Sequence, residues 1–595
     1  MGVLLNRRFF YGNDDLLQFS AAREDGLSWR FLSLNVFQHF GPYDRFGHWL
    51  VYQYTDLSPA LGLSLVLANC TALLAACLWL MTELRLSALR RVVALIVIAL
   101  SAPTVESGIW FDASMHILPA IAATIAVCAA HVRAVRTGRR RWHVITVVLF
   151  VLAQLTQERP VLALPLLVLV DVLLLWQALP WRTRGRRLWS LRWPLAALAL
   201  AAAAIAAALQ EFVVLRTFAT PSWGVTARHM LMAVTDYAVP SMINRPRGEP
   251  TTLPVELAVL AGLLAAGLLL ARLRKYNAGP LLFVAAVFLL YYGFLKLSPM
   301  LTADLIKENA LRLHNAVYAT VPAIIGLAHV RLPRLRVRRR PPAEQPSRAA
   351  HRVLQVSGCL ALAAYLLLSC IGYLDRRWDD TTRARAYVDA VRASVSAWSD
   401  PGVDVVPLFA PSAMATGWSA EMARHDVLLP FIDKDVSVGA VGRSMVLIDN
   451  HGQVQPAALA TVRPEVDLVD GGCGASGRRL TDKADLYFPT IGTSPLFLRL
   501  GYRASQDMDI RLSSAWNHVW TANSWPTRLP AGSHTRLIPI ASPLLLGIDL
   551  QTGTPGAEFC VATASIVRAV QVDEATQRCR EVDWFGRSGR VTHCP

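Results

Sequence analysis

The sequence predicts a polytopic α-helical membrane protein with an extracytoplasmic domain at its C-terminal end. Of its 595 residues, 54% are hydrophobic and only 17% are charged, whereas a soluble globular chain carries roughly 25% charged residues. The mean hydropathy is +0.37, although the second half contains a polar stretch of ordinary composition. These values exclude a single soluble domain, a disordered chain, a collagen-like chain and a coiled-coil rod.

Ten segments are apolar over about the 20 residues that a membrane-spanning helix needs. The fourth of them is short, and the third begins close behind the second. The region 58–374 is therefore predicted to be a transmembrane domain, preceded by an extracytoplasmic loop at 1–57. The expected spans are 58–82, 92–109, 113–131, 143–157, 160–179, 193–213, 253–271, 279–298, 313–330 and 353–374.

Basic residues gather in every second loop between these segments. The arginine-rich stretches are 85–91, 133–141, 182–192, 272–275 and 331–352. Short loops rich in Lys and Arg stay in the cytoplasm, so the alternate loops, which hold the acidic residues, are expected outside. The net charge of +17 is thus a topology signal, and the expected surroundings are membrane lipid rather than nucleic acid.

The N-terminal segment starts outside without a preceding span. Its first residues, MGVLLNRRFFYGNDDLL, are too few and too charged for a signal peptide. Either the N-terminus is translocated unaided, or a first span upstream of Met1 was lost through a late start. We favour the second explanation, which predicts an apolar stretch upstream.

The chain after residue 374 is predicted to lie outside the membrane. Residues 375–464 are expected to form a small α/β segment, with a helix at 380–398. Residues 465–595 contain short β-rich runs separated by turn residues every 8–12 positions, a spacing typical of a β-sandwich. The clustered Trp516, Trp520 and Trp525 are either core residues or a surface that stacks on sugar rings.

The nine cysteines fall into two groups. Five lie in apolar runs, where packing is the expected role. The other four lie in the polar C-terminal part, and an even number in an oxidising compartment predicts two disulfides. All three connectivities stay open, and a zinc site is a weaker alternative because the sequence has no CxxC pair. These four are Cys473, Cys560, Cys579 and Cys594.

Asp14 and Asp15 are the first candidates for chemistry. They are adjacent carboxylates in an apolar and aromatic setting, YGNDDLLQF, close to the membrane. Burial and a neighbouring like charge both raise the pKa of a carboxyl group, which suits a general base near neutral pH. The alternative is a helix N-cap or a turn, where aspartate is also common.

Further ionisable residues stand at the outer ends of spans. Glu106 and Asp112 either are functional or mark the water interface. The pair Glu158 and Arg159 interrupts an apolar run just before Pro160, and a helix start is the alternative there.

A third group is cationic and lies before the ninth span. Lys307, Arg312 and His314 stand in the sequence LIKENALRLHNAVYA. Cations at the outer surface can hold a phosphate. Contact with lipid headgroups is the alternative.

The order of these motifs resembles the GT-C superfamily of membrane glycosyltransferases, in particular the protein O-mannosyltransferase and TMTC-like branch, over about 10–330. That family has an acidic pair in its first extracytoplasmic loop, as Asp14 and Asp15 are here. Its later motifs are similar to SAPTVESGIWFDASMHIL, LAQLTQERPVLALPLLVLVD and ENALRLHNAVYATVP. Two departures are the missing span before the acidic pair and Gln157 in place of the family's lysine before the glutamate.

The resemblance implies an inverting glycosyltransferase. It would move a sugar from a polyprenyl-phosphate donor to an extracytoplasmic glycan or protein acceptor, with no cofactor and no metal. Asp14 or Asp15 would be the general base, with Asp14 slightly preferred. Substrate-binding roles are expected for Glu106, Asp112, Glu158, Arg159, Lys307, Arg312 and His314.

The main alternative is a non-catalytic transporter of lipid-linked glycan, or an envelope scaffold with a glycan-binding outer domain. Transporters favour charged or Gly/Pro-broken spans near the bilayer midplane. Here the mid-span residues are almost all apolar, and the acids collect at one surface, which favours surface chemistry. A hydrolase in the C-terminal domain is disfavoured because the sequence has no GxSxG nucleophile motif.

Overall fold

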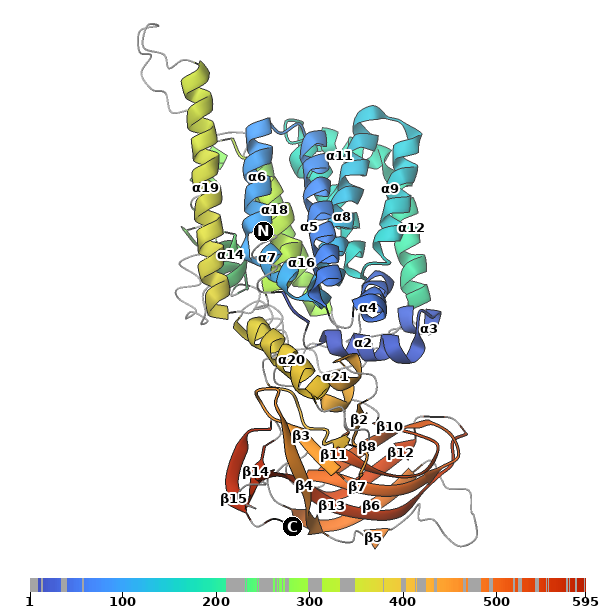
Figure 1. The fold of residues 1–595 in the computed structure, drawn as a ribbon. Helices are drawn as coiled ribbons and strands as arrows, with labels where there is room; N and C mark the ends of the chain where they lie inside the picture. The colour runs from blue at the N-terminus through green and yellow to red at the C-terminus, as the bar shows by residue number, and fades with distance from the viewer. Residues whose placement is uncertain are drawn as a thin grey trace. The chain divides into compact units, whose positions relative to one another are not determined.

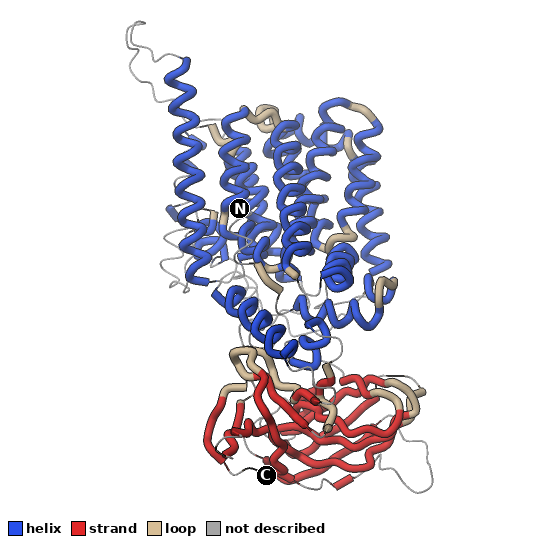
Figure 2. Tube along the Cα trace, in the orientation of Figure 1, coloured by secondary structure: helices blue, strands red, loops and turns tan. Residues whose placement is uncertain are grey.

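The computed structural model contains two compact units (Figure 1). The first unit contains Ala21–Asp379 together with the start of the chain up to Phe10, and the second contains Tyr11–Ser20 and Asp380–Pro595. Figure 2 shows helices in the first unit and mostly strands in the second. The structure describes the whole chain apart from residues 1–8, 12–13, 34–39, 56–57, 210–230, 232, 243, 245–260, 263–264, 266, 270, 273–277, 298–312, 332–347, 378, 398–402, 412–413, 415–423, 433–435, 443, 464–466, 469–482, 492–495, 517–518, 523–526, 541–544, 553, 555, 574–575, 577, 584–585, 593 and 595.

Short helices precede the long apolar helices. α2 (Asp14–Asp25) begins in the segment that belongs to the second unit, and α3 (Trp29–Leu32) and α4 (Pro42–Thr55) follow in the first. The next elements are α5 (Pro59–Glu83), α6 (Ala88–Leu100), α7 (Ala102–Ile109), α8 (Phe111–Thr137), α9 (Arg140–Ala153), η1 (Arg159–Leu162), α10 (Ala163–Leu169), η2 (Val170–Leu175), α11 (Trp181–Ser190) and α12 (Arg192–Leu209). Later in the unit come η3 (Ala233–Ala238), α14 (Val239–Ser241), α16 (Ala278–Leu297), α18 (Leu313–Leu327) and α19 (Arg348–Arg377).

Local sequence explains where the long helices begin and end. Pro59 opens α5, because proline has no N–H to lose in the first turn and its φ already suits a helix. α8 ends at Gly138, which has φ 64°, and the Gly138 amide donates to the Ala134 carbonyl at 2.9 Å. Glycine is favoured there because it adopts this left-handed conformation without a clash.

Several helices are suited to a membrane. Among the described residues, α5, α8 and the 355–372 part of α19 are each long and apolar enough to cross one. The bent pairs α6–α7, at 46°, and α11–α12, at 62°, would bring the number of spans to five. Figure 1 shows α5, α6, α8 and α9 running alongside one another. The chain is thus a membrane protein with a helical core.

Two predicted spans are broken in the structure. The segment 92–109 is divided between α6 and α7, which meet at Ser101. The segment 160–179 contains a 3₁₀ turn, a short α-helix and a π-helical turn, η1, α10 and η2. Most of the predicted span 253–271 lies outside the described residues.

The second unit contains two β-sheets, with α20 (Asp379–Ala397) and α21 (His425–Ile432) beside them in the sequence. One sheet has nine strands in the order β11-β7-β13-β4-β3-β1-β2, with β14 and β15 joined beside β13. The other has six strands in the order β10-β8-β12-β6-β5, with β9 paired to β8. The strands are β1 (Val403–Val405), β2 (Ser437–Val438), β3 (Ser444–Ile448), β4 (Val454–Arg463), β5 (Asp467–Leu468), β6 (Lys483–Ile491), β7 (Leu496–Ala504), β8 (Met508–Trp516), β9 (Val519–Ala522), β10 (Thr527–Leu529), β11 (Gly532–Ile540), β12 (Leu545–Thr552), β13 (Phe559–Asp573), β14 (Arg578–Val582) and β15 (Ser588–Thr592).

Strand β7 of the nine-stranded sheet packs against a hydrophobic core on each face. Along β7, Leu496 and Leu498 face a core that also contains Ile510 and Leu550 from the other sheet. Phe497 points the opposite way, into a second core, because successive side chains of a strand alternate between faces. The two sheets therefore pack as a sandwich. Strand β4 lies before the expected boundary at residue 464 and pairs with β13, which lies after it.

One disulfide of the second unit is described in full. Cys579 and Cys594 are joined across 15 residues, and Cys560 is disulfide-bonded as well. Cys473, Trp525 and the side chains of Trp516 and Trp520 lie outside the described residues. The five cysteines of the apolar runs are free thiols: Cys70, Cys77, Cys128, Cys359 and Cys370.

Candidate active site

Two helices of the first unit carry the same short pattern near their N-terminal ends, an aspartate in the first turn followed four residues later by a histidine. In α4 the pattern is DRFGH (44–48), and in α8 it is DASMH (112–116). Residues four apart lie on one face of a helix. The Nδ1 atom of His48 is 3.1 Å from a carboxylate oxygen of Asp44, and that of His116 is 3.3 Å from Asp112. An aspartate in the first turn is also stabilised by the helix dipole.

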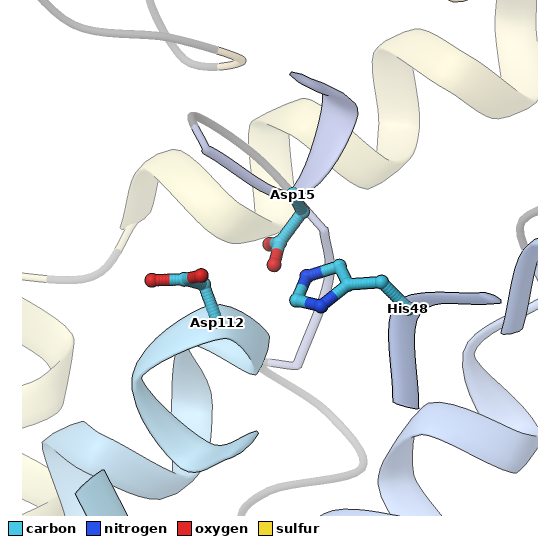
Figure 3. Close-up of side chains that lie close together, drawn as sticks. All are labelled: Asp15, His48 and Asp112. Carbon is cyan, nitrogen blue, oxygen red and sulfur yellow. The ribbon is translucent and has the colours of Figure 1, made fainter. Parts of the chain in front are cut away.

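The two pairs lie next to one another. Asp44, Asp112 and His116 each place one polar atom within 4.8 Å of the others. Asp44, His48 and Asp112 are all buried, so their charges are compensated by neighbours rather than by water. Figure 3 shows the imidazole of His48 and the carboxylate of Asp112 extending from their helices toward the same space.

Two arginines add positive charge to this group. Arg45 is only 2% exposed and forms an ion pair with Asp44. Arg159, at the start of η1, places its guanidinium 4.9 Å from the centre of the Tyr318 ring. His116 interacts electrostatically with Arg159 as well as with both aspartates. The site therefore alternates acidic and basic groups from α4, α8 and η1.

Neutral contacts hold α4 against α5 and α8. The Tyr43 hydroxyl donates to Oδ1 of Asn69 at 2.8 Å, and Nδ2 of Asn69 donates to the Ser114 carbonyl at 3.1 Å. Burial raises the pKa of Tyr43, with the Asn69 hydrogen bond acting in the opposite direction. A Cβ on Gly47 would come within 2.2 Å of the Met115 methyl group, so the glycine allows the close approach of α4 and α8.

The structure brings some predicted site residues together. Asp112 belongs to the cluster, and Arg159 interacts electrostatically with His116, which is paired with Asp112. Glu158 precedes η1 directly and is half-buried. Glu106 lies in α7 and is 4% exposed, and its carbonyl accepts the Trp110 amide.

Asp14 and Asp15 form the first turn of α2, in the segment grouped with the second unit. Asp15 is fully buried and is drawn in Figure 3. The side chain of Asp14 lies outside the described residues. Asp15 is thus the member of the pair whose side chain the structure describes.

Most of the predicted cationic group falls in a part of the chain that the structure does not describe. Lys307 and Arg312 lie outside the described residues. His314 is the second residue of α18, and its side chain is not among those described.

Sequence reasoning missed four residues of the cluster: Asp44, Arg45, His48 and His116. The available signal was the repeat of the Asp-x-x-x-His pattern in two segments 68 positions apart. In each segment the spacing predicts that both side chains lie on the same helix face. It does not show that the two helices meet.

The cluster can hold charges and move protons. A carboxylate next to an imidazole fixes the orientation of the ring, and arginine binds phosphate with two parallel hydrogen bonds. Asp44, Asp112 and His116 are also close enough to share a metal ion. Arg45 and His48 already pair with Asp44, so a cation would have to compete with them.

Comparisons find distant structural likenesses only. No protein-family model and no curated protein matches the chain. A crystal structure of ArnT from Cupriavidus metallidurans bound to undecaprenyl phosphate is similar, with 14% identity, a TM-score of 0.41, and coverage of 73% of this chain and 83% of that one. Its apo state gives 15% identity, a TM-score of 0.42, and coverage of 73% and 82%.

A third similar structure is an oligosaccharyltransferase of Archaeoglobus fulgidus in complex with Zn and sulfate. It is 10% identical, has a TM-score of 0.32, and covers 95% of both chains. Likenesses at this level are too distant to place the chain in a family or to assign it a reaction.

Proposed function

We propose that the chain is an integral membrane glycosyltransferase. It transfers a sugar from a polyprenyl-phosphate donor to an extracytoplasmic acceptor, either a glycan or a protein. The observation that carries this proposal is the group of paired aspartates and histidines, with the buried Arg45, at the adjoining ends of α4 and α8. Ionisable groups in an apolar helical unit are expensive to bury and are therefore expected to be functional.

The reaction suits a lipid-linked substrate. The lipid tail lies against apolar helices, and the phosphate-linked sugar reaches the polar group at the helix ends. Arg45 and Arg159 are proposed to bind the phosphate, because guanidinium groups match its geometry. Asp44 and Asp112 keep the imidazoles of His48 and His116 oriented beside it.

The chemical step is an inverting displacement at the anomeric carbon. A carboxylate takes the proton of the acceptor hydroxyl, whose oxygen forms a bond to the anomeric carbon. The bond from that carbon to the phosphate oxygen breaks, and its electron pair leaves with the lipid phosphate, where cations stabilise it. We assign the proton transfer to the acidic pair at the start of α2, and within that pair to Asp15, because its side chain is fully buried.

The test is a cell-envelope glycan assay with Asp15→Asn in the full chain. The expected result is at least a hundredfold loss of product at normal protein abundance, since general acid–base groups contribute about 10²–10⁴ in rate. Asp14→Asn is expected to have a smaller effect. Asp25→Asn is the matched control, because Asp25 is in the same helix and lies 3.6 Å from the guanidinium of Arg30.

The same assay separates the enzyme from a glycan transporter or scaffold. A full glycan yield from Asp15→Asn and Asp14→Asn, together with its loss on deletion of the gene, would contradict catalysis by this pair and would favour the non-catalytic role.

A further inference from the structure

Helix α11 lies apart from the proposed active site and is turned away from its neighbour. It meets α12 at an angle of 62°. Beyond Trp193, α12 contains no charged residue. With α12 as the part of the bent pair that crosses the membrane, α11 runs closer to the membrane plane than to its normal. Helices of this kind lie at the membrane interface when they are amphipathic.

Large aromatic side chains are exposed on this helix and just beyond it. The exposed fractions are 61% for Trp181, 70% for Trp189 and 73% for Trp193. Tryptophan is enriched at membrane–water interfaces, where its ring lies at the level of the headgroups. Trp181 and Trp189 are eight residues apart, so they project about 80° from each other around the helix and form one aromatic side.

Exposed arginines flank this aromatic side. Arg182 and Arg186 are four residues apart and share one face, and Arg187 is exposed as well. The Arg192 guanidinium lies over the rings of Trp189 and Trp193, 5.4 and 5.7 Å from their centres. The segment 181–193 contains no acidic residue, so its surface charge is positive throughout.

The remaining arginine of the helix fixes its position. Arg184 is 8% exposed and donates to the carbonyls of Leu179 at 2.8 Å, Val172 at 3.0 Å and Gln177 at 2.6 Å. These bonds attach α11 to the end of η2 and satisfy carbonyls that a helix end leaves unpaired. The exposed arginines and tryptophans therefore belong to a helix whose position is fixed by these hydrogen bonds.

We propose that α11 and the first residues of α12 bind the headgroups of anionic phospholipids. The guanidinium groups of Arg182, Arg186 and Arg187 contact lipid phosphates, and the tryptophans lie at the boundary with the acyl chains. Charge complementarity selects lipids with net negative charge, because each basic residue near an anionic membrane surface adds about 1 kcal/mol, or about fivefold, to binding. This end of the helical unit is the one that the sequence predicts to face the cytoplasm.

The test measures lipid binding by the purified full chain in detergent micelles. Fluorescent phosphatidylglycerol and phosphatidylcholine are titrated separately. The expected result is at least tenfold tighter binding of phosphatidylglycerol by the wild type. The variant Arg182→Gln/Arg186→Gln/Arg187→Gln should lose at least tenfold of that affinity and leave phosphatidylcholine binding within twofold, because its changed side chains are exposed.

A charge-matched variant provides the control. Arg139→Gln/Arg140→Gln/Arg141→Gln also removes three exposed arginines, and it should change phosphatidylglycerol binding by less than twofold. An equal loss in both triple variants would overturn the proposal, because binding would then follow net charge. Full displacement of the lipid by inorganic phosphate, but not by chloride at equal ionic strength, would also overturn it in favour of a free-phosphate site.

Discussion

At the residue scale, the proposed active site depends on charges that are buried in pairs. Asp44 is shared between Arg45 and His48, and Asp112 is paired with His116. Removing one partner of a buried pair leaves the other charge uncompensated, which is far more unfavourable than the pair is favourable. Each of these residues is therefore expected to affect stability as well as activity.

Asp44→Asn should destabilise the protein by about 3 kcal/mol, because the buried Arg45 charge loses its carboxylate partner. The measurement is the thermal unfolding midpoint of the purified full chain. Adding Arg45→Met to this variant should restore more than half of the loss. A double variant no more stable than the single one would contradict the pairing.

His425 in the second unit predicts a pH dependence. It is fully buried, its Nε2 is 2.7 Å from the Tyr387 hydroxyl oxygen, and burial lowers its pKa from 6.5 to about 4. Below pH 6.5 the unfolded chain therefore binds a proton that the folded chain does not. Stability contributed by the neutral histidine is present above pH 6.5 and decreases by about 3 kcal/mol as the pH falls to about 4.

The thermal midpoint of the wild type and of His425→Phe, measured between pH 8 and pH 4, checks this expectation. The variant should be less stable at pH 8 and should lose less stability than the wild type as the pH falls. Parallel pH profiles would show that His425 does not titrate in this way.

Single residues show how far the sequence could predict the site. Asp112 and Arg159 were recognisable because they are charges at the ends of apolar segments. His48 and His116 were missed because their only signal, the repeated Asp-x-x-x-His spacing, does not show that the two helices meet. The contact between α4 and α8 depends on small features, such as Gly47 beside Met115, that composition does not reveal.

At the scale of elements, the break between α6 and α7 is held by a distant residue. Oδ1 of Asn244 accepts the Ala102 amide at 2.6 Å, and its Nδ2 donates to the carbonyls of Leu100 and Leu366 at 2.9 and 2.8 Å. One side chain thus provides hydrogen-bond partners for backbone groups on both sides of the break and connects the break to α19.

Asn244→Ala should destabilise the protein by about 2–4 kcal/mol, because it leaves buried backbone groups without partners. Thermal unfolding of the full chain measures the effect. Thr124→Ala is the matched control, since it also removes a buried polar group, whose hydroxyl donates to the Ala120 carbonyl within its own helix α8. A loss in Asn244→Ala no larger than in the control would contradict this role.

Hydropathy predicted whole helices better than broken ones. The predicted span 58–82 agrees closely with α5, and 279–298 agrees with α16. The predicted span 160–179 contains η2, in which Asp171 meets His131 of α8 at 2.9 Å. A local sequence window cannot show such a partner 40 residues away.

At the scale of the whole molecule, the chain combines an apolar helical unit with a two-sheet unit. The alternation of strand and turn residues was enough to predict the sheets. The sheet order was not predictable, because it depends on pairs such as β4 with β13, more than 100 residues apart. The disulfide between Cys579 and Cys594 selects among connectivities that the cysteine count left open.

Replacing both Cys579 and Cys594 by serine should lower the stability of the second unit by about 3 kcal/mol, the value expected for a closed loop of about 15 residues. Thermal unfolding with and without reductant checks this. The reductant should shift the wild type toward the variant. A variant as stable as the oxidised wild type would show that this bond contributes nothing.

The central claim is that the buried Asp–His cluster supports transfer of a lipid-linked sugar. It is tested most directly by the transfer rate of the purified, reconstituted full chain, supplied with sugar-labelled polyprenyl-phosphate lipid from cells that make the glycan. Asp112→Asn should lower kcat at least a hundredfold, while Asp389→Asn, an exposed aspartate paired with Arg392, should leave it within twofold. Transfer by Asp112→Asn at the wild-type rate would contradict the account.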